Sequence, residues 1–407
     1  MRFFYNLSIK LYTSAIYIAS LKNKKAKLWI KGRKNLFKDL ENKCKNKQHI
    51  IWFHCASLGE FEQGRPLIEM IKKEKPETTI LLTFFSPSGY EYRKNYALAD
   101  IITYLPADTS RNAKKFLSIV QPKHIFFIKY EYWFNYINEA FKQKIPFYMI
   151  SAIFRKNQRF FAPYGFWFRK ELSKITHFFL QNEESKKLLN SIHITQCDVV
   201  GDTRFDTVSE LSPYKDSIID SFCEHQEVFI AGSTWKEDEL MLKSHIKNRD
   251  VKWIIAPHEI YQERISQIKT FFDSLGCISY TEAHKITNFN PYKILIIDKI
   301  GMLKNIYHYG KIAYIGGGFG KGIHNVLEAA TFGKPIIFGP NYKHFKEAND
   351  LVEKRVAFSV RNDNELITTI KNLSQPTLLQ KTSDAARTYI DTHKGASKKI
   401  FSFVFMK

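Results

Sequence analysis

The sequence contains few of the residues that crosslink secreted proteins or bind structural metals. Its 407 residues include five cysteines, which lie far apart and form no CxxC pair. This spacing fits a reducing compartment and argues against a disulfide framework and a cysteine-based metal site. The sequence also lacks zinc-finger spacing, an RNP-like strand and basic-leucine heptads, so nucleic acid is not an expected partner. The cysteines are Cys44, Cys55, Cys197, Cys223 and Cys277.

Acidic residues are also scarce. The chain has 40 aspartates and glutamates against 62 lysines and arginines, a formal net charge of +22. This excess favours an anionic partner such as an acidic membrane surface or a phosphorylated substrate, although a soluble basic protein without such a partner is the alternative. With 44% hydrophobic and 25% charged residues the chain is globular, and its length suggests two domains.

The first forty residues combine an apolar segment with a basic flank. The run "FFYNLSIKLYTSAIYIASL" is barely long enough to cross a bilayer, and lysines and arginines follow it. A signal peptide is disfavoured because no small-residue cleavage site follows and the basic cluster lies on the wrong side. We expect a helix anchored in or on a membrane, with its basic flank against anionic headgroups. An amphipathic helix packed on the protein itself is the alternative.

The remainder alternates apolar runs with helical stretches. Runs as continuous as "IIWFHCAS", "HIFFIKYEYW" and "KIAYIGGGF" are typical of strands buried on both faces, so the pattern predicts parallel sheets covered by helices. Polar residues cluster near "FDTVSELSPYKDS", which indicates a joint between two doubly wound α/β domains facing each other across a cleft. The expected parts are an anchor over 1–40, domains over 41–207 and 208–385, and a C-terminal helix over 386–407 returning to the first domain.

Several motifs stand where expected strands end. Glu60 follows the first strand within "HCASLGEFEQG", and Glu131 ends another in "KYEYWFN". Ligands of open α/β sheets bind beyond such strand ends. Ser57 and Glu60 also spell the S-x-x-E of a capping box, a purely structural reading, and Glu131 could occupy a mere edge position. Arg204 in "GDTRFD" could be a surface charge.

The second half contains a glycine-rich strand-to-helix turn, "YIGGGFGKGIHNVLEAATFGKP". Its glycines, including Gly317 and Gly318, would let backbone N–H groups approach a phosphate. It is not a Walker motif, and Asn325 with Glu328 could be helix caps only. Two other turns add hydroxyl donors and a histidine that could itself be a cap or solvated: Ser233 and Thr234 in "AGSTWKEDE", and His258 in "APHEI".

In combination these motifs resemble those of the Kdo transferases, the enzymes that transfer 3-deoxy-D-manno-octulosonic acid (Kdo) in lipopolysaccharide synthesis. The resemblance runs from about residue 5 to about residue 395, although the glycine and glutamate pattern alone is shared with other two-domain glycosyltransferases. It implies a GT-B fold and inverting, metal-independent transfer from CMP-Kdo to a lipid A precursor. No cofactor is expected, and the implied location is the cytoplasmic face of the inner membrane.

The resemblance also implies residue roles. Glu60 would be the base that deprotonates the acceptor hydroxyl. Glu131 and Arg204 would stabilise the transition state, although the family usually has lysine at the position of Arg204, and arginine changes the geometry of that charge.

The implied CMP site departs from the family pattern in two places. Many members have Arg-His where this chain has Pro257-His258, and Ile300-Gly301-Met302 replaces the more usual Met-Gly-Glu. The remaining residues of the implied donor site are Ser233, Thr234, Gly317, Gly318, Asn325, Val326, Leu327 and Glu328.

Two alternatives remain at this stage. Another GT-B glycosyltransferase or a sugar-nucleotide epimerase would use a different nucleotide sugar. A non-catalytic nucleotide- or lipid-binding protein would need no base, so the presence of Glu60 together with the glycine turn favours an enzyme.

Overall fold

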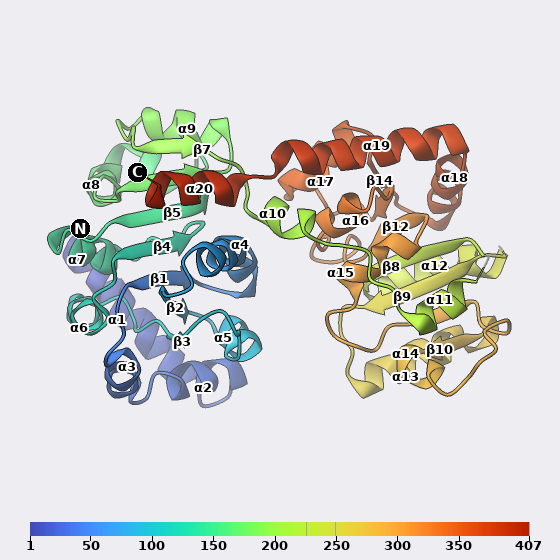
Figure 1. The fold of residues 1–407 in the computed structure, drawn as a ribbon, viewed down its shortest axis with the longest axis horizontal. Coiled ribbons are helices and arrows are strands. Elements are labelled where there is room, and N and C mark those ends of the chain that lie inside the picture. The colour runs from blue at the N-terminus through green and yellow to red at the C-terminus, as the bar shows by residue number, and fades with distance from the viewer. Residues whose placement is uncertain (225, 249, 407) are drawn as a thin grey trace. The chain divides into compact units, whose positions relative to one another are not determined.

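The structure, a computed structural model, describes residues 1–224, 226–248 and 250–406. The chain forms two compact units. The first contains residues 1–207 and the C-terminal segment from Lys394, and the second runs from Val208 to His393. Figure 1 shows a sheet with flanking helices in each unit.

The first unit is built on a seven-stranded parallel sheet of order β3-β2-β1-β4-β5-β6-β7. The strand order reverses between β1 and β4, as in Rossmann folds. The strands are β1 (Ile50–Cys55), β2 (Thr79–Phe84), β3 (Ile101–Tyr104), β4 (His124–Ile128), β5 (Phe147–Ala152), β6 (His177–Leu180) and β7 (Cys197–Val199).

Helices cover both faces of this sheet. They are α1 (Arg2–Ala19), α2 (Lys24–Lys31), α3 (Leu36–Cys44), α4 (Leu58–Glu74), α5 (Pro87–Arg93), α6 (Ser110–Val120), α7 (Phe134–Lys142), α8 (Phe166–Leu172), α9 (Glu183–Asn190) and α20 (Ala396–Phe405), with 3₁₀ turns η1 (Arg159–Phe161) and η2 (Pro163–Gly165). Helix α10 (Arg204–Ser209) lies where the first unit passes into the second.

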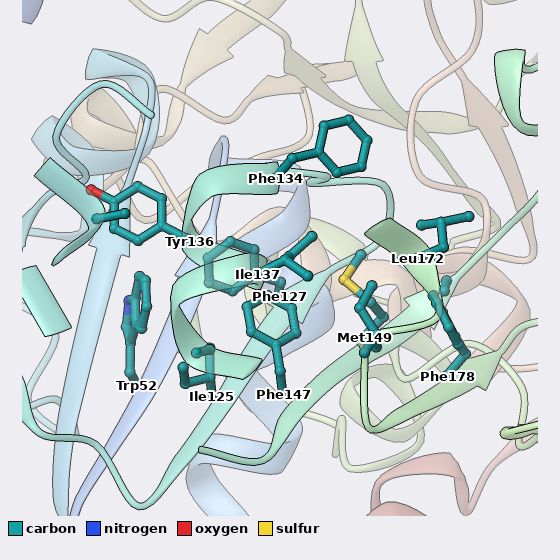
Figure 2. Packing of buried hydrophobic residues seen from close by; sticks show 14 of the residues in the cluster. Trp52, Ile125, Phe127, Phe134, Tyr136, Ile137, Phe147, Met149, Leu172 and Phe178 are labelled. Atoms are coloured by element: carbon teal, nitrogen blue, oxygen red, sulfur yellow. The ribbon is translucent and has the colours of Figure 1, made fainter. Parts of the chain in front are cut away.

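The alternation of side chains along β1 explains its uninterrupted apolar sequence. Trp52 packs in the cluster on the side of α6 and α7, which Figure 2 shows, whereas Ile51 and Phe53 pack on the side of α4 and α20. A strand covered on both faces needs apolar residues at successive positions. His54 is the polar exception within this strand and is fully buried.

The second unit repeats the architecture with a seven-stranded parallel sheet of order β10-β11-β9-β8-β12-β13-β14, which reverses between β8 and β12. The two sheets confirm the predicted doubly wound α/β class. The strands are β8 (Val228–Thr234), β9 (Lys252–Pro257), β10 (Cys277–Ser279), β11 (Ile294–Ile296), β12 (Ile312–Ile315), β13 (Ile336–Phe338) and β14 (Ala357–Ser359).

The helices of the second unit are α11 (Ser217–Cys223), α12 (Lys236–Asn248), α13 (Gln262–Phe272), α14 (Tyr280–Ala283), α15 (Leu303–Ile306), α16 (Leu327–Thr331), α17 (Lys346–Glu353), α18 (Asp363–Leu373) and α19 (Pro376–His393), with 3₁₀ turns η3 (Asp273–Leu275) and η4 (Tyr307–Tyr309). The chain then returns to the first unit, where α20 packs on α4.

The N-terminal segment forms the expected helix, α1. One side of it is tied to the first unit, because the Tyr5 hydroxyl donates to Asp108 at 2.5 Å and Asn135 donates to Asn6 at 2.9 Å. The other side exposes apolar side chains. Across the described part of the chain, no helix combines the length and apolarity needed to cross a membrane. The exposed large apolar residues of α1 are Phe3, Phe4, Leu7, Leu11, Tyr12, Tyr17 and Ile18.

Candidate active site

Two glutamates follow neighbouring strands at the point where the order of the first sheet reverses. Glu60 lies in the first turn of α4, directly after β1, and Glu131 follows β4. Strands β1 and β4 are hydrogen-bonded neighbours, so both carboxylates lie at one edge of the sheet. Burial, followed by the charges of Glu60 and Glu131, raises the pKa of the Cys55 thiol well above its usual value. The reversal point is where open α/β sheets bind ligands.

Glu60 does not act as a helix cap. Ser57 occupies the N-cap position of α4, but its side chain accepts no hydrogen bond from the helix backbone. Its hydroxyl instead donates to Oε2 of Glu60. Ser279 and Glu282, by contrast, form a complete capping box at α14. The structural alternative for the S-x-x-E pattern is therefore wrong at Glu60, whose carboxylate is half-buried and not used by the helix backbone.

Glu131 is held by its neighbours. Its Oε2 accepts a hydrogen bond from Nε1 of Trp133 at 2.8 Å and lies 3.6 Å from Nε2 of His54. The preceding Lys129 has φ of 68°, a left-handed conformation that is costly for a residue other than glycine. A tight, strained turn thus aims the Glu131 segment after β4.

A chain of buried, hydrogen-bonded side chains connects this carboxylate to the core of the first sheet. Trp133 Nε1 also donates to Nε2 of His54 at 3.2 Å, so the imidazole proton lies on Nδ1, 2.9 Å from Oγ1 of Thr83. The same Oγ1 accepts from Nε1 of Trp52 at 2.8 Å. His54 and Trp133 were missed as functional residues by sequence reasoning. The available signal was a histidine inside an otherwise apolar strand.

Arg204 forms an ion pair rather than a free surface charge. Its Nε and Nη2 donate to Oδ2 of Asp202 at 2.9 and 2.8 Å. Burial raises the pKa of Asp202, but the guanidinium outweighs it and the net pKa lies below the usual value. Gln63, one turn after Glu60 on α4, also donates to Asp202 at 3.1 Å. These contacts tie Arg204 to the helix that carries Glu60.

The second unit gathers several of the expected donor-site residues where its strand order reverses. Ser233 has φ of 55°, and a Cβ added at Gly316 would lie 2.3 Å from its carbonyl oxygen, so β8 and β12 approach closely. Thr234 is 1% exposed, and its hydroxyl donates to Glu239 at 3.0 Å. The Thr234 side chain is therefore occupied internally. Pro257 ends β9 beside it.

Three aromatic rings form a stack at this edge. The His258 and His324 rings lie 4.2 Å apart, and Trp235 stacks on His258 at 4.7 Å. Trp235 Nε1 donates to Nε2 of His324 at 3.1 Å. Burial and the adjacent His258 lower the pKa of His324 to about 4, and burial also lowers the pKa of His258. Trp235 and His324 were not predicted, because their meeting depends on the pairing of β8 with β12.

The backbone of the glycine-rich turn makes more contacts within the protein than the sequence suggested. The N–H of Gly317 donates to Oδ2 of Asp238 at 2.9 Å, so this amide is occupied within the protein, and its contact with a phosphate stays a prediction. Asp238 also accepts from the N–H of Trp235 and from Tyr314. Gly318 is required by packing, since a Cβ there would lie 2.5 Å from the backbone of Gly339.

The segment Asn325 to Glu328 enters the short helix α16. Oδ1 of Asn325 accepts from the N–H of Leu327, and its Nδ2 donates to Glu328 at 3.0 Å. Asn325 therefore stabilises the start of α16, the structural role that the sequence left open. A ligand role for Glu328 stays a prediction. The side chains of Val326 and Leu327 are buried, so a ligand could meet only their backbone.

The segment 300–302 leads into α15, whose Leu303 lies against Gly232 of β8. It follows β11, which is separated from β8 by β9. Ile300 is 76% exposed, and Gly301 has φ of 87° with open space where a Cβ would lie. In the part of the chain that the structure describes, no three His, Cys, Asp or Glu residues are grouped so as to hold a metal ion.

Comparison with known proteins shows similarity to one family of transferases. Residues 30–207 match the sequence profile described as 3-deoxy-D-manno-octulosonic-acid transferase (kdotransferase). A 3-deoxy-D-manno-octulosonic acid transferase of Rickettsia bellii is 27% identical over 390 residues, 92% of this chain and 91% of its own length. The profile match and the similarity to these transferases support a Kdo transferase. The chain is therefore a glycosyltransferase.

Two further relatives define the extent of this similarity. A bifunctional glycosyltransferase/methyltransferase of Fusobacterium nucleatum is 26% identical over 398 residues, and the alignment covers 93% of this transferase but only 60% of the Fusobacterium protein. Among solved structures, a UDP-GlcNAc 2-epimerase from Neisseria meningitidis bound to UDP-GlcNAc matches with a TM-score of 0.61 at 16% identity, covering 88% of this transferase and 99% of the epimerase. This last likeness concerns the fold alone.

Proposed function

We propose that the protein transfers Kdo from CMP-Kdo to a lipid A precursor, with inversion and without a metal ion, at the cytoplasmic face of the inner membrane. The observation that carries this proposal is the Glu60 carboxylate. In a chain similar to the Kdo transferases it stands at the reversal point of the first sheet and is not used as a helix cap.

Glu60 acts as the general base. Its carboxylate takes the proton of an acceptor sugar hydroxyl as that oxygen attacks the anomeric carbon of Kdo. The bond between this carbon and the phosphate oxygen of CMP breaks, and its electron pair leaves with CMP. Ser57, which donates to one carboxylate oxygen, orients the group and leaves the other oxygen for the acceptor.

Glu131 and Arg204 assist at the transition state. Glu131 is fixed by Trp133 and stabilises positive charge that develops on the sugar ring as the leaving group departs. Arg204 supplies a cation for the carboxylate of Kdo or the phosphate, although its pairing with Asp202 leaves only part of its hydrogen-bonding capacity for a ligand.

The second unit binds the CMP part of the donor. The stack of Trp235, His258 and His324 offers an aromatic surface and imidazole N–H groups where many relatives of the family have an arginine. Glu328, in the first turn of α16, is an acceptor for ribose hydroxyls. Anchoring by α1 brings the protein to its acceptor, since exposed apolar residues and a net charge of +22 suit an anionic bilayer.

The test is transfer by the purified protein with CMP-Kdo and a tetra-acylated lipid A precursor, read by mass spectrometry. UDP-GlcNAc replaces CMP-Kdo as the donor control, and EDTA-treated protein tests the requirement for metal. We expect a product heavier by one or more Kdo residues from CMP-Kdo alone, with and without EDTA. Conversion of UDP-GlcNAc instead would overturn the proposal.

Glu60→Gln is the decisive variant for the mechanism. An amide fits the space of the carboxylate but accepts no proton, and general-base catalysis is worth about 10² to 10⁴ in rate. We expect turnover to fall at least about a hundredfold while CMP-Kdo binding and the unfolding temperature stay near those of the parent. A folded variant with parental turnover would require another base, with Glu131 the first candidate.

A further inference from the structure

A groove of about 700 Å³ in the first unit is lined by the two residues that flank Glu131 in the chain. Its walls come from three separate segments. Helix α1 contributes Tyr5 and Ser8, the segment after β4 contributes Tyr130 and Tyr132, and the segment after β5 contributes residues 155 and 157–160. We call it the aromatic groove. None of the expected site residues lines it, but Tyr130 and Tyr132 flank Glu131 directly in the chain.

The interior of the aromatic groove is apolar and firmly packed. Tyr132 meets Phe160 edge to face at 4.9 Å, and Phe160 meets Phe168 at 6.2 Å. Phe134, which also lines the groove, packs on Phe168 at 5.7 Å. Such interlocked rings give fixed apolar walls that suit a hydrocarbon chain better than a polar ligand.

One polar group in the wall of the groove has no partner. The Tyr132 hydroxyl is buried and makes no hydrogen bond with any described residue. Burial also raises the pKa of Tyr132 well above its usual value, so the group is a neutral donor. A buried donor without a partner is unfavourable and rare, which points to a ligand that accepts from it. The carbonyl of an ester or amide that links an acyl chain to a sugar is such an acceptor.

The rim of the groove is basic. Arg155 and Arg159 line it, both are exposed, and no carboxylate of the described residues pairs with either guanidinium. Arginine binds phosphate oxygens with directed hydrogen bonds. Outside the groove, α1 continues the apolar surface with exposed residues such as Phe4 and Leu11. The groove therefore offers an apolar floor, a rim site that can bind an anion, and an exposed apolar surface beside it.

We propose that the aromatic groove binds one acyl chain of a phosphorylated lipid acceptor, with a lipid phosphate at Arg155 and Arg159 and the acyl carbonyl at the Tyr132 hydroxyl. This inference rests on the proposed function and specifies how the acceptor is held. The remaining chains of the lipid lie against the exposed face of α1 and the bilayer. The sugar is thereby kept near Glu131 and, one strand away, Glu60.

The direct test is binding of decyl phosphate, kept monomeric, to the full-length protein by titration calorimetry. Ser8→Trp fills the groove from an exposed position of α1, and Ser14→Trp is the matched control, exposed on the same helix outside the groove. We expect Ser8→Trp to weaken binding at least about tenfold, equivalent to about 1.4 kcal/mol, and Ser14→Trp to leave it unchanged. Equal affinity in parent and Ser8→Trp would overturn the groove as the site.

The rim is tested with the Arg155→Ala, Arg159→Ala double variant. It should weaken decyl phosphate binding but change decanol binding little, because only the first ligand carries the anion. Inorganic phosphate alone should bind weakly to the parent. If phosphate binds as tightly as decyl phosphate, the site is an anion site without an acyl subsite, and the proposal fails.

Transfer assays separate this proposal from the proposed function. With CMP-Kdo, the parent should prefer the acylated precursor over its deacylated form, and Ser8→Trp should reduce that preference by raising KM for the acylated acceptor only. If the parent transfers Kdo and Ser8→Trp keeps the full preference, the groove does not bind the acceptor. If the parent transfers no Kdo, the proposed function fails, while the decyl phosphate measurements still decide whether the groove binds an acyl phosphate.

Discussion

Thr83 illustrates how a single buried hydroxyl can support a reactive group that it does not touch. It accepts hydrogen bonds from Trp52 and His54, and His54 in turn meets Trp133 and Glu131. The three members of this network that lie in strands, Trp52, His54 and Thr83, are fully buried. Buried polar chains of this kind are stabilising only when every member has a partner. The network therefore couples the core of the first sheet to the position of Glu131.

Thr83→Val tests this network. Valine keeps the shape but leaves the Trp52 and His54 donors without their acceptor, and each buried unpaired donor costs about 1–3 kcal/mol. We expect a lower free energy of unfolding in urea and a lower turnover. Thr103→Val, on the half-buried Thr103 of β3, is the control and should change both values less. Equal effects of the two substitutions would mean that the hydroxyl of Thr83 contributes nothing specific.

His324 predicts a pH dependence of stability in the second unit. Its folded-state pKa of about 4 lies below the usual histidine value of 6.5 because burial and His258 disfavour the charged ring. Between these pH values the unfolded chain binds a proton that the folded chain does not. Stability from this residue is therefore fully present above pH 6.5 and is lost as the pH falls toward 4.

The measurement is urea unfolding at pH 7 and pH 5 for the parent and His324→Gln. Glutamine can still accept the hydrogen bond from Trp235 but does not titrate in this range. The parent should lose more stability than the variant between the two pH values. The same loss in both proteins would show that other groups account for the acid sensitivity.

At the scale of elements, the sequence predicted best what depends on local pattern. The uninterrupted apolar runs identified the strands of both sheets except the three-residue β10, because strands covered on two faces need apolar residues at successive positions. What the sequence could not decide depended on distant partners. Gly317 is occupied because Asp238, far away in the chain, reaches its N–H. The local S-x-x-E pattern was equally compatible with a cap, and only the direction of the Ser57 hydroxyl decided against it.

Helix α1 supports a prediction at this scale. Deletion of residues 1–21 would also remove the Tyr5 contact with Asp108, so exchange of exposed side chains is the cleaner test. Phe4 and Leu11 are 66% and 62% exposed. Replacing both by serine should reduce sedimentation of the protein with anionic vesicles, because apolar burial contributes to the binding.

The matched control exchanges two comparably exposed apolar residues of the second unit, Leu240→Ser and Tyr261→Ser, and should not change vesicle binding. High salt should release the parent only in part, since it screens the lysines and arginines but not buried side chains. Complete release of the parent by salt would show that burial of the apolar side chains of α1 does not contribute to vesicle binding.

At the scale of the whole molecule, the chain passes twice between its units. It leaves the first unit after Thr207 and returns at Lys394. The return is fixed by Asp206, whose carboxylate accepts from the N–H groups of Gly395 and Ser397 at 2.5 and 2.7 Å. Helix α20 then places buried residues in the core of the first unit. The last residues of the chain are thus part of the unit that carries Glu60, although 186 residues of the second unit intervene.

Truncation after His393 should therefore destabilise the first unit and spare the second. The change removes Ile400 and Phe401, which are 0% and 4% exposed, from the face of the sheet covered by α4. Removing large buried side chains costs about 2–5 kcal/mol each. Hydrogen exchange followed by mass spectrometry should show faster exchange in α4 and β1, with α12 and β9 unchanged.

The milder variant Asp206→Ala should show the same pattern with smaller amplitude, because it removes only the acceptor of the two N–H groups. Acceleration confined to the second unit, or equal in both, would contradict the assignment of α20 to the first.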